Sequence, residues 1–219
     1  MAEERTYMRQ LGVLPYAELR KTRVTLIGAG AIGGFTALAL AKMGVGFLEV
    51  WDFDTVEEHN LPNQWYRRED IGKPKVACLK ANLEGCSDVN VVVHAEAYKK
   101  QRLQPIVITA VDSMDVRLTL WEVIRDNTKV LFLIDGRMGA QLGRVLVVDK
   151  ANAAVVENYV KEELYPSSEA FQAPCTERST VYCAAGLSSY IASAVGKIVA
   201  SQPVKPTLSV DFFNWEVAP

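Results

Sequence analysis

The chain has 219 residues, which is enough for one large α/β domain or two small ones. Its 24 basic and 26 acidic side chains give a net charge of -2, which argues against the basic surface that nucleic-acid-binding proteins use. The most apolar late stretch, residues 183–200, contains several serines and Lys197, so we expect neither a membrane span nor a membrane partner. The polar N-terminus has no apolar signal core, and the expected location is the cytoplasm.

Cysteine and histidine spacing argues against a structural metal site. The cysteines are Cys78, Cys86, Cys175 and Cys183. None of them forms a C-x-x-C pair, and the chain has only two histidines, His59 and His94. We therefore expect no zinc and no disulfide framework.

Strand and helix patterns alternate along the first part of the chain. After a helical arm over 5–21, the expected elements are a strand at 24–27, a helix at 31–43, a strand at 47–51, a polar loop at 54–73, a helix at 74–83, strands at 89–94 and 106–111, a helix at 115–125 and a strand at 130–134. This alternation predicts a Rossmann-like, doubly wound, mostly parallel sheet.

The remaining third of the chain has a different pattern. It predicts a strand at 143–148, a helix at 152–164, a flexible crossover loop at 165–180, a helix at 183–200 and a last strand at 207–217. We expect this part to add an antiparallel C-terminal portion to the sheet.

A glycine-rich turn follows the first strand. Gly28, Gly30 and Gly33 have the G-x-G-x-x-G spacing between a strand and a helix. Glycines allow the tight turn and the close approach of a phosphate, and the helix N-terminus offers free N–H groups to an anion. The turn predicts a bound nucleotide but does not specify the chemistry.

Polar side chains are concentrated downstream of this turn. They are Asp52, Asp54, Asn60, Gln64, Lys75 and Asp112. Asp52 ends the second strand, where an acid binds ribose hydroxyls in many dinucleotide folds, and Asp112 follows the fourth strand. Because the carboxyl ends of parallel strands line one crevice, Asp52, Asp112 and the glycine turn should converge there. An aspartate facing a triphosphate suggests magnesium, and Lys75 would neutralise phosphate charge.

Each of these side chains also has a purely structural interpretation. Asp54 could form a turn or cap, Asn60 could satisfy a loop backbone, and Lys75 could be a solvated first-turn residue. Asp112, which precedes Ser113, could cap the next helix. The occurrence of all of them in this order favours a functional site.

These residues resemble the motifs of the ThiF/MoeB/HesA family, the bacterial relatives of ubiquitin-activating enzymes. The matching segments are Tyr7–Gln10, Gly28–Gly34, Asp52–Val56, Asn60-Leu61, Gln64, Gly72–Val76, Asp112 with Arg117, and Cys175–Glu177. The resemblance covers nearly the whole chain and implies a single adenylation domain over 1–219.

The resemblance implies ATP and magnesium as cofactors and a small β-grasp protein as the partner, a ubiquitin-like or sulfur-carrier protein whose C-terminal carboxylate is adenylated. By the same resemblance, Asp52 holds the ribose, Asp54 and Asn60 line the nucleotide pocket, and Lys75 contacts phosphate. Asp112 would bind magnesium. Arg9 would reach the ATP of a neighbouring subunit, which implies a homodimer, and Cys175 stands where many members place a reactive cysteine.

The sequence departs from the family pattern in two ways. Asn63 stands where the family usually has an arginine, so one phosphate-neutralising charge is missing or is supplied by Arg67 or Arg68. The C-x-x-C zinc pairs of many members are also absent. Some divergent members activate a peptide or a modified tRNA, so the resemblance leaves the substrate open.

Three functions are compatible with the sequence. The first is an ATP-dependent adenylyltransferase, with or without transfer of the activated carboxylate to a cysteine. The second is an NAD-dependent Rossmann oxidoreductase, which would leave Asn60, Lys75 and Asp112 without a role. The third is a non-catalytic dimeric pseudo-enzyme, and Asn63 is the residue that favours it.

Overall fold

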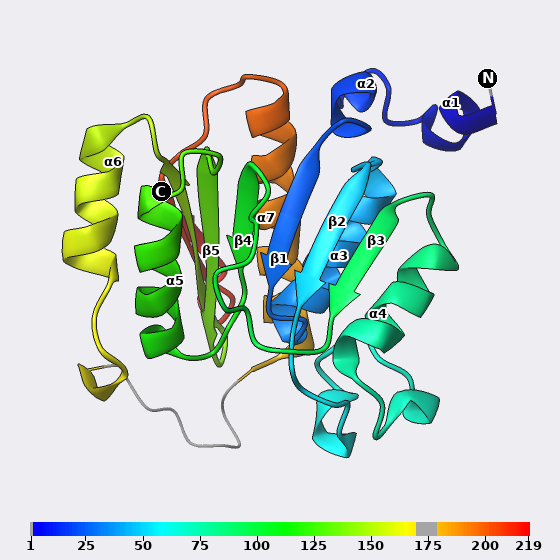
Figure 1. Ribbon diagram of the computed structural model, residues 1–219, viewed down its shortest axis with the longest axis horizontal. Coiled ribbons are helices and arrows are strands. Elements are labelled where there is room, and N and C mark those ends of the chain that lie inside the picture. The colour runs from blue at the N-terminus through cyan, green and yellow to red at the C-terminus, as the bar shows by residue number, and fades with distance from the viewer. Residues whose placement is uncertain (1, 170–178) are drawn as a thin grey trace.

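The computed structural model describes residues 2–169 and 179–219, which form a sheet of eight strands flanked by helices (Figure 1). The strand order is β3-β2-β1-β4-β5-β6-β7-β8. The strands are β1 (Arg23–Ile27), β2 (Phe47–Trp51), β3 (Asn90–His94), β4 (Ile106–Thr109), β5 (Phe132–Gly139), β6 (Leu142–Asp149), β7 (Thr207–Asp211) and β8 (Glu216–Ala218). The α-helices are α1 (Ala2–Tyr7), α2 (Tyr16–Leu19), α3 (Ala31–Met43), α4 (Lys75–Glu84), α5 (Met114–Asp126), α6 (Ala153–Asn158) and α7 (Val181–Val199).

The first five strands are parallel, which confirms the predicted doubly wound sheet. The predicted bounds of the helix at 31–43 and the strand at 47–51 match α3 and β2. Helix α3 ends at Gly44, whose φ of +91° is a left-handed conformation that glycine adopts without steric cost. The strand order reverses between β1 and β4. Their carboxyl ends therefore border a topological switch point, where open α/β sheets bind ligands.

Strands β6, β7 and β8 are antiparallel, which confirms the expected C-terminal portion. The strand predicted over 130–134 begins at Phe132 and continues to Gly139, because eight consecutive residues pair with β6. The single strand predicted over 207–217 is wrong. The chain forms two paired strands there, with a turn between them in which Trp215 has a φ of +60°.

Other predicted bounds also need correction. The helical arm over 5–21 is two short helices joined by turns, because Pro15 precedes α2 and cannot donate a helix hydrogen bond. The strand predicted to reach residue 111 ends at Thr109. The helix predicted over 152–164 is α6 followed by a π-helical turn at Tyr159–Glu163. Of the expected crossover loop at 165–180, residues 170–178 lie outside the described residues.

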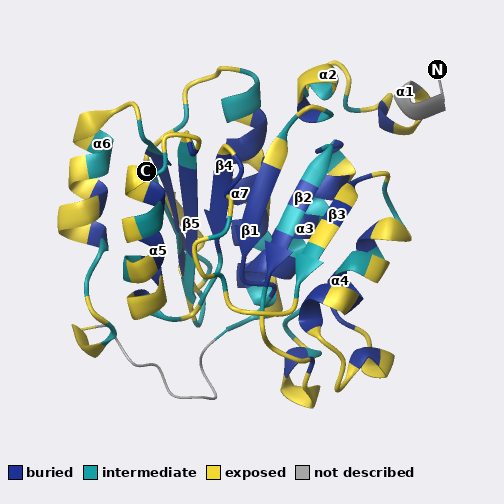
Figure 2. Ribbon diagram, viewed as in Figure 1, coloured by how far each residue is buried: buried dark blue, intermediate teal, exposed yellow. Residues whose placement is uncertain are grey.

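Two hydrophobic clusters cover the two faces of the sheet. The first joins the sheet to α3, α4 and α7 and contains Leu40, Leu79 and Ile191. The second joins it to α5 and the π turn and contains Ile124 and Tyr159. Because both faces are covered, the central strands are buried along most of their length (Figure 2). Within residues 2–169 and 179–219, no helix combines the length and the apolarity needed to cross a membrane.

Candidate active site

The glycine turn connects β1 to α3 at the switch point. Gly28 has a φ of +99°, and a Cβ there would lie 2.5 Å from the Ala110 carbonyl oxygen. A Cβ on Gly33 would lie 1.9 Å from the Gly28 carbonyl oxygen. A Cβ on Gly30 would meet nothing within 4 Å, and no side chain caps the helix at this residue. Gly28 and Gly33 therefore serve the close packing of the turn, whereas Gly30 leaves open space at the N-terminus of α3, where an anion can bind.

These three environments predict different results for alanine substitutions. Gly33→Ala should destabilise the fold by about 1–3 kcal/mol, because the new methyl group would collide with backbone that cannot move away freely. Gly30→Ala, the matched control, should cost less than about 1 kcal/mol of stability yet weaken nucleotide binding, because its methyl group enters the space that a phosphate would occupy. Thermal unfolding and calorimetric ATP titration measure the two effects. Equal stability losses in both variants would contradict the assignment.

Asp52 fixes the shape of the turn. Its Oδ2 accepts a hydrogen bond from the Ala29 N–H at 2.6 Å, and its Oδ1 accepts one from the Asp54 N–H at 2.8 Å. Burial raises the pKa of Asp52, although the two N–H groups and the charge of Lys75 act in the opposite direction. An ionised carboxylate offers about four lone-pair sites, so Asp52 can still accept hydrogen bonds from ribose hydroxyls.

Asp54 and Lys75 form an ion pair beside the turn. The Lys75 Nζ lies 2.8 Å from Asp54 Oδ2, and the Lys75 backbone N–H donates to the Asp54 carbonyl at 2.9 Å. The Lys75 side chain is only 8% exposed, whereas that of Asp54 is 49% exposed. Lys75 is thus a buried cation, and the alternative of a solvated first-turn lysine is wrong.

Asn60 and Gln64 lie in the loop between β2 and α4, which contains the 3-10 turns Glu58–Asn60 and Arg68–Asp70. Asn60 is buried, and its Oδ1 accepts a hydrogen bond from the Glu57 N–H at 2.9 Å, so it satisfies the loop backbone. The buried Gln64 Oε1 has no hydrogen-bond partner among the described residues. Contact of either residue with a nucleotide stays a prediction.

Asp112 follows the end of β4, and its carboxylate has no partner within the described residues. It is exposed and makes no hydrogen bond or ion pair in the described part of the chain. Ser113, and not Asp112, caps α5, because its Oγ accepts a hydrogen bond from the Val116 N–H at 3.4 Å. A Cβ on Gly28 would lie 3.2 Å from the Val111 nitrogen, so the segment leading to Asp112 lies against the glycine turn.

Arg9 lies outside the site of its own chain. It is exposed in the turns after α1, and the neighbouring Gln10 Nε2 donates to the Lys42 carbonyl near the C-terminus of α3. The glycine turn is at the other end of this 13-residue helix, about 20 Å away. Figure 1 shows α1 and α2 near the end of the sheet where β1 and β2 begin.

The cysteines have different environments. Cys175 lies outside the described residues. Cys78 and Cys183 are buried, and burial raises the pKa of the Cys183 thiol to about 11. Asn63, which stands where the family usually has an arginine, donates a hydrogen bond from Nδ2 to Ser179 Oγ. Arg67 and Arg68, which could supply the missing charge, are exposed.

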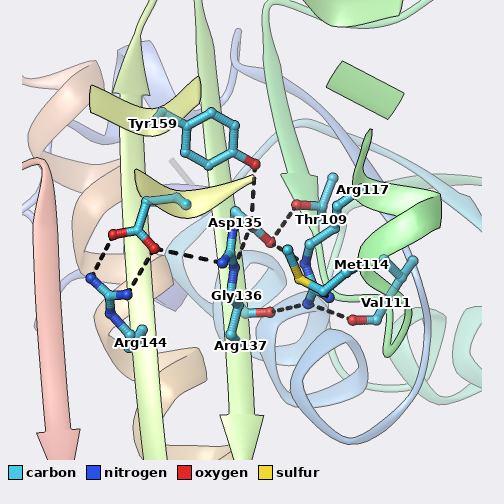
Figure 3. A network of polar contacts seen from close by, with 10 residues as sticks. Thr109, Val111, Met114, Arg117, Asp135, Gly136, Arg137, Arg144 and Tyr159 are labelled. Atoms are coloured by element: carbon cyan, nitrogen blue, oxygen red, sulfur yellow. Dashed lines mark hydrogen bonds and ion pairs between the residues drawn. The ribbon is translucent and has the colours of Figure 1, made fainter. Parts of the chain in front are cut away.

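A buried charge network, which sequence reasoning missed, reaches the carbonyl of Val111, the residue before Asp112 (Figure 3). Asp135 on β5 is fully buried, and its Oδ1 accepts hydrogen bonds from Thr109 Oγ1 and Arg117 Nε, both at 2.9 Å. Its Oδ2 accepts one from Arg137 Nε at 2.9 Å and one from the Tyr159 hydroxyl at 3.1 Å. All of its roughly four lone-pair sites are used, so Asp135 has no capacity left for a ligand.

The network continues from β5 to the adjacent antiparallel strand β6, which carries Arg144. Glu163 pairs with Arg137 at 3.6 Å and accepts two hydrogen bonds from Arg144, both at 2.7 Å. Burial alone would raise the pKa of Asp135, but the charges of Arg117 and Arg137 outweigh it and hold that pKa below its usual value. Asp135 is therefore a structural acid, whereas Asp112 has no partner among the residues that the structure describes.

The comparison with known families decides the classification of the chain. The model of the ThiF family matches residues 3–214. The chain belongs to the ThiF family. The resemblance inferred from the motifs is thereby confirmed.

Curated relatives carry names of adenylyltransferases. The sulfur carrier protein adenylyltransferase of Thermus thermophilus is 26% identical over 212 residues, which are 92% of this chain and 74% of that protein. The sulfur carrier protein ThiS adenylyltransferase of Bacillus subtilis is 34% identical over 111 residues, 46% of this chain and 33% of that protein. Ubiquitin-like modifier-activating enzyme 5 of Dictyostelium discoideum is 29% identical over 109 residues, 49% of this chain and 26% of that protein. The match thus covers most of the first protein but a third or less of the other two.

Solved structures share the fold. PaaA aligns with a TM-score of 0.76 and 17% identity, covering 99% of this chain and 72% of that chain. Escherichia coli MccB, in a crystal structure with ATP, aligns with a TM-score of 0.73 and 16% identity, covering 97% of this chain and 70% of that chain. The mixed α/β fold with antiparallel C-terminal strands is therefore a known ThiF-type fold.

Proposed function

We propose that this ThiF-family chain is an ATP-dependent adenylyltransferase that activates the C-terminal carboxylate of a small ubiquitin-like or sulfur-carrier protein. The observation that carries the proposal is that two groups able to bind a ligand lie at the same switch point. These are the open N-terminus of α3 at Gly30, which no side chain caps, and the carboxylate of Asp112, which has no partner in the described part of the chain. The first suits a phosphate, and the second suits a cation that accompanies it.

The residues present fit ATP and magnesium. Asp52 retains acceptor capacity for ribose hydroxyls, Gly30 leaves room for phosphate, and Asp112 would hold magnesium. When bound, magnesium supplies positive charge that neutralises phosphate oxygens. Lys75 adds a buried positive charge beside the turn, although it is paired with Asp54 before the nucleotide binds.

The proposed reaction is acyl-adenylate formation. A carboxylate oxygen of the partner attacks the α-phosphorus of ATP, a new O–P bond forms, and the bond to the bridging oxygen breaks as pyrophosphate leaves. The chain contributes by holding the phosphates at the N-terminus of α3 and by neutralising charge with Lys75. One eight-stranded sheet takes strands from both halves of the chain, which supports a single adenylation domain over 1–219.

A homodimer is part of the proposal. The turn that contains Arg9 lies near the C-terminus of α3, and the glycine turn is at the other end of this helix, which is about 20 Å long, so we expect Arg9 to complete the site of another copy. Two apolar side chains close to it on the same arm, Met8 at 66% and Val13 at 81% exposure, offer a surface for such a copy. We therefore expect each Arg9 to reach the ATP of the neighbouring subunit.

Mixing two inactive variants tests this dimer. Arg9→Ala and Asp112→Ala chains, after mixing and subunit exchange, should regain about one quarter of wild-type activity, because half of the dimers are mixed and one site in each is intact. The unmixed variants are the controls. Sedimentation should give a dimer, and a fully active monomer would contradict the proposal.

Cys175 is proposed to receive the activated carboxylate or its sulfur derivative. An acyl-adenylate is electrophilic, and attack by a thiolate would form a thioester and release AMP. A non-reducing gel after incubation with ATP and the carrier should show a reductant-sensitive adduct that is lost in Cys175→Ala. Cys183→Ala, which removes a buried thiol, should keep it. If Cys175→Ala completes the whole transfer at the normal rate, the cysteine has no such role.

Calorimetric titration of the purified protein with ATP plus magnesium and, separately, with NAD tests the proposed function against the alternatives. Binding of ATP alone agrees with the proposal, whereas binding of NAD alone would favour the oxidoreductase. A dimer that binds neither would favour the pseudo-enzyme. Asn63 supports this last alternative, because its amide is bonded to Ser179 and adds no positive charge to the site.

A further inference from the structure

Within residues 2–169 and 179–219, only the backbone holds Asp112 in place. Its carboxylate is exposed and makes no hydrogen bond or ion pair with the described residues, so no side-chain contact in that part of the chain fixes its direction. On one side, the Ala110–Val111 backbone lies against Gly28, because a Cβ on Gly28 would be 2.5 Å from the Ala110 oxygen. The other side of this segment must therefore be held by something else.

Arg117 holds that other side. Its Nη2 donates to the Val111 carbonyl at 2.5 Å, one residue before Asp112, and to the Gly136 carbonyl at 3.1 Å. Its Nε donates to Asp135 Oδ1 at 2.9 Å, and its Nη1 donates to the Met114 sulfur at 3.8 Å. One guanidinium thus ties the end of β4 to β5 and to the start of α5 (Figure 3).

The arrangement requires an arginine and a buried acid together. A guanidinium has donors in a fixed planar fork, whereas a lysine ammonium is a compact charge that cannot span Asp135 and two separate carbonyl groups. Asp135 is fully buried and also accepts hydrogen bonds from Thr109, Arg137 and Tyr159. The Arg117 side chain is itself only 5% exposed. The fork is therefore locked in place before any ligand binds.

We propose that Arg117, locked by Asp135, is a positioning residue that holds the Val111–Asp112 peptide so that the Asp112 carboxylate faces the space in front of the glycine turn. The proposal rests on the proposed function, because Asp112 is taken there as the ligand of the cation that accompanies ATP. It adds that Arg117 and Asp135, whose side chains are buried, determine how much magnesium strengthens ATP binding.

The first test measures ATP affinity by calorimetry with and without magnesium. In Arg117→Lys the affinity for ATP without magnesium should change less than about twofold, because the glycine turn and Asp52 are intact. The gain in affinity that magnesium provides should fall by about 10-fold to 100-fold, the range typical when a group that orients a metal ligand is altered. Arg144→Lys is the matched control, because its two hydrogen bonds go to Glu163 and not to the segment before Asp112.

A double variant separates positioning from general destabilisation. Because Arg117 is proposed to act through Asp112, Arg117→Lys combined with Asp112→Ala should bind ATP plus magnesium no more weakly than Asp112→Ala alone. Additive losses would overturn the proposal, as would a normal magnesium gain in Arg117→Lys. Thermal unfolding shows whether each variant is folded at the assay temperature. If Arg117→Lys is unfolded at that temperature, the titrations of all variants are repeated at a lower temperature at which it is folded, with the same loss of the magnesium gain expected.

The outcome is distinguishable from failure of the proposed function. A wild-type chain that binds ATP more tightly with magnesium, yet gives no pyrophosphate exchange with a carrier protein, would contradict the proposed function. The positioning role of Arg117 would then still be decided by the calorimetric titrations of the variants. A wild-type chain whose ATP affinity does not respond to magnesium would overturn the positioning role itself.

Discussion

Asp112→Ala is expected to reduce carrier-dependent ATP–pyrophosphate exchange by about 100-fold to 1000-fold. The carboxylate lies at the switch point without a partner in residues 2–169 and 179–219, and its loss removes the proposed contact to the cation on the phosphates. Binding of ATP without magnesium should survive, because the glycine turn and Asp52 are untouched. Exchange of labelled pyrophosphate into ATP measures the rate.

A neighbouring acid provides the control for this experiment. Asp115 is also exposed, but its carboxylate accepts a hydrogen bond from the Ser167 N–H at 2.9 Å, so it is engaged elsewhere. Asp115→Asn should leave the exchange rate within about threefold of wild type, because it removes no charge-stabilising contact of the proposed site. An Asp112→Ala enzyme with a normal exchange rate, or equal losses of exchange rate in both variants, would contradict the proposed role of Asp112.

Asp135→Asn is expected to lower the free energy of unfolding by about 3–5 kcal/mol at neutral pH, because it leaves the charges of Arg117 and Arg137 without their buried partner. Asp126→Asn, at an acid whose side chain is 74% exposed, should change stability by less than about 0.5 kcal/mol. Urea unfolding of the three proteins gives both values. A loss below about 1 kcal/mol in Asp135→Asn would contradict the network.

The stabilisation by Asp135 also has a defined pH dependence. Its pKa is lower in the folded chain than the ordinary value of about 3.9 in the unfolded chain. The carboxylate therefore contributes its full stabilisation above about pH 4, and this contribution is lost as the pH falls through the folded pKa. The difference in stability between wild type and Asp135→Asn should accordingly be constant near neutrality and shrink in acid.

The local parts of the site were predictable from the sequence. The glycine spacing and the apolar strand before it predict the turn, and Asp52 and Asp112 follow strands whose carboxyl ends meet at one edge. The ion pair between Asp54 and Lys75 was not predicted, although both residues were assigned to the site. A lysine after a proline gives no indication that its ammonium group is buried.

The network around Asp135 could not be predicted in the same way. Its partners come from separate elements: Thr109 from β4, Arg117 from α5 and Tyr159 from the π turn. Only the fold brings them together, and a charged residue is rarely buried unless it is paired. The one available signal was the pair Asp135 and Arg137, which places charged residues at alternate positions directly after an apolar strand pattern. Similarly, Asn63 and Ser179 are joined although they lie 116 positions apart.

Pyrophosphate exchange with a carrier protein is the decisive test of adenylyltransferase activity. Label from pyrophosphate should enter ATP only when magnesium and a small β-grasp protein with a free C-terminal carboxylate are both present. Mass spectrometry should then detect that protein with one AMP attached. An exchange rate that does not change when the carrier is added, or when its C-terminal residues are removed, would contradict the account.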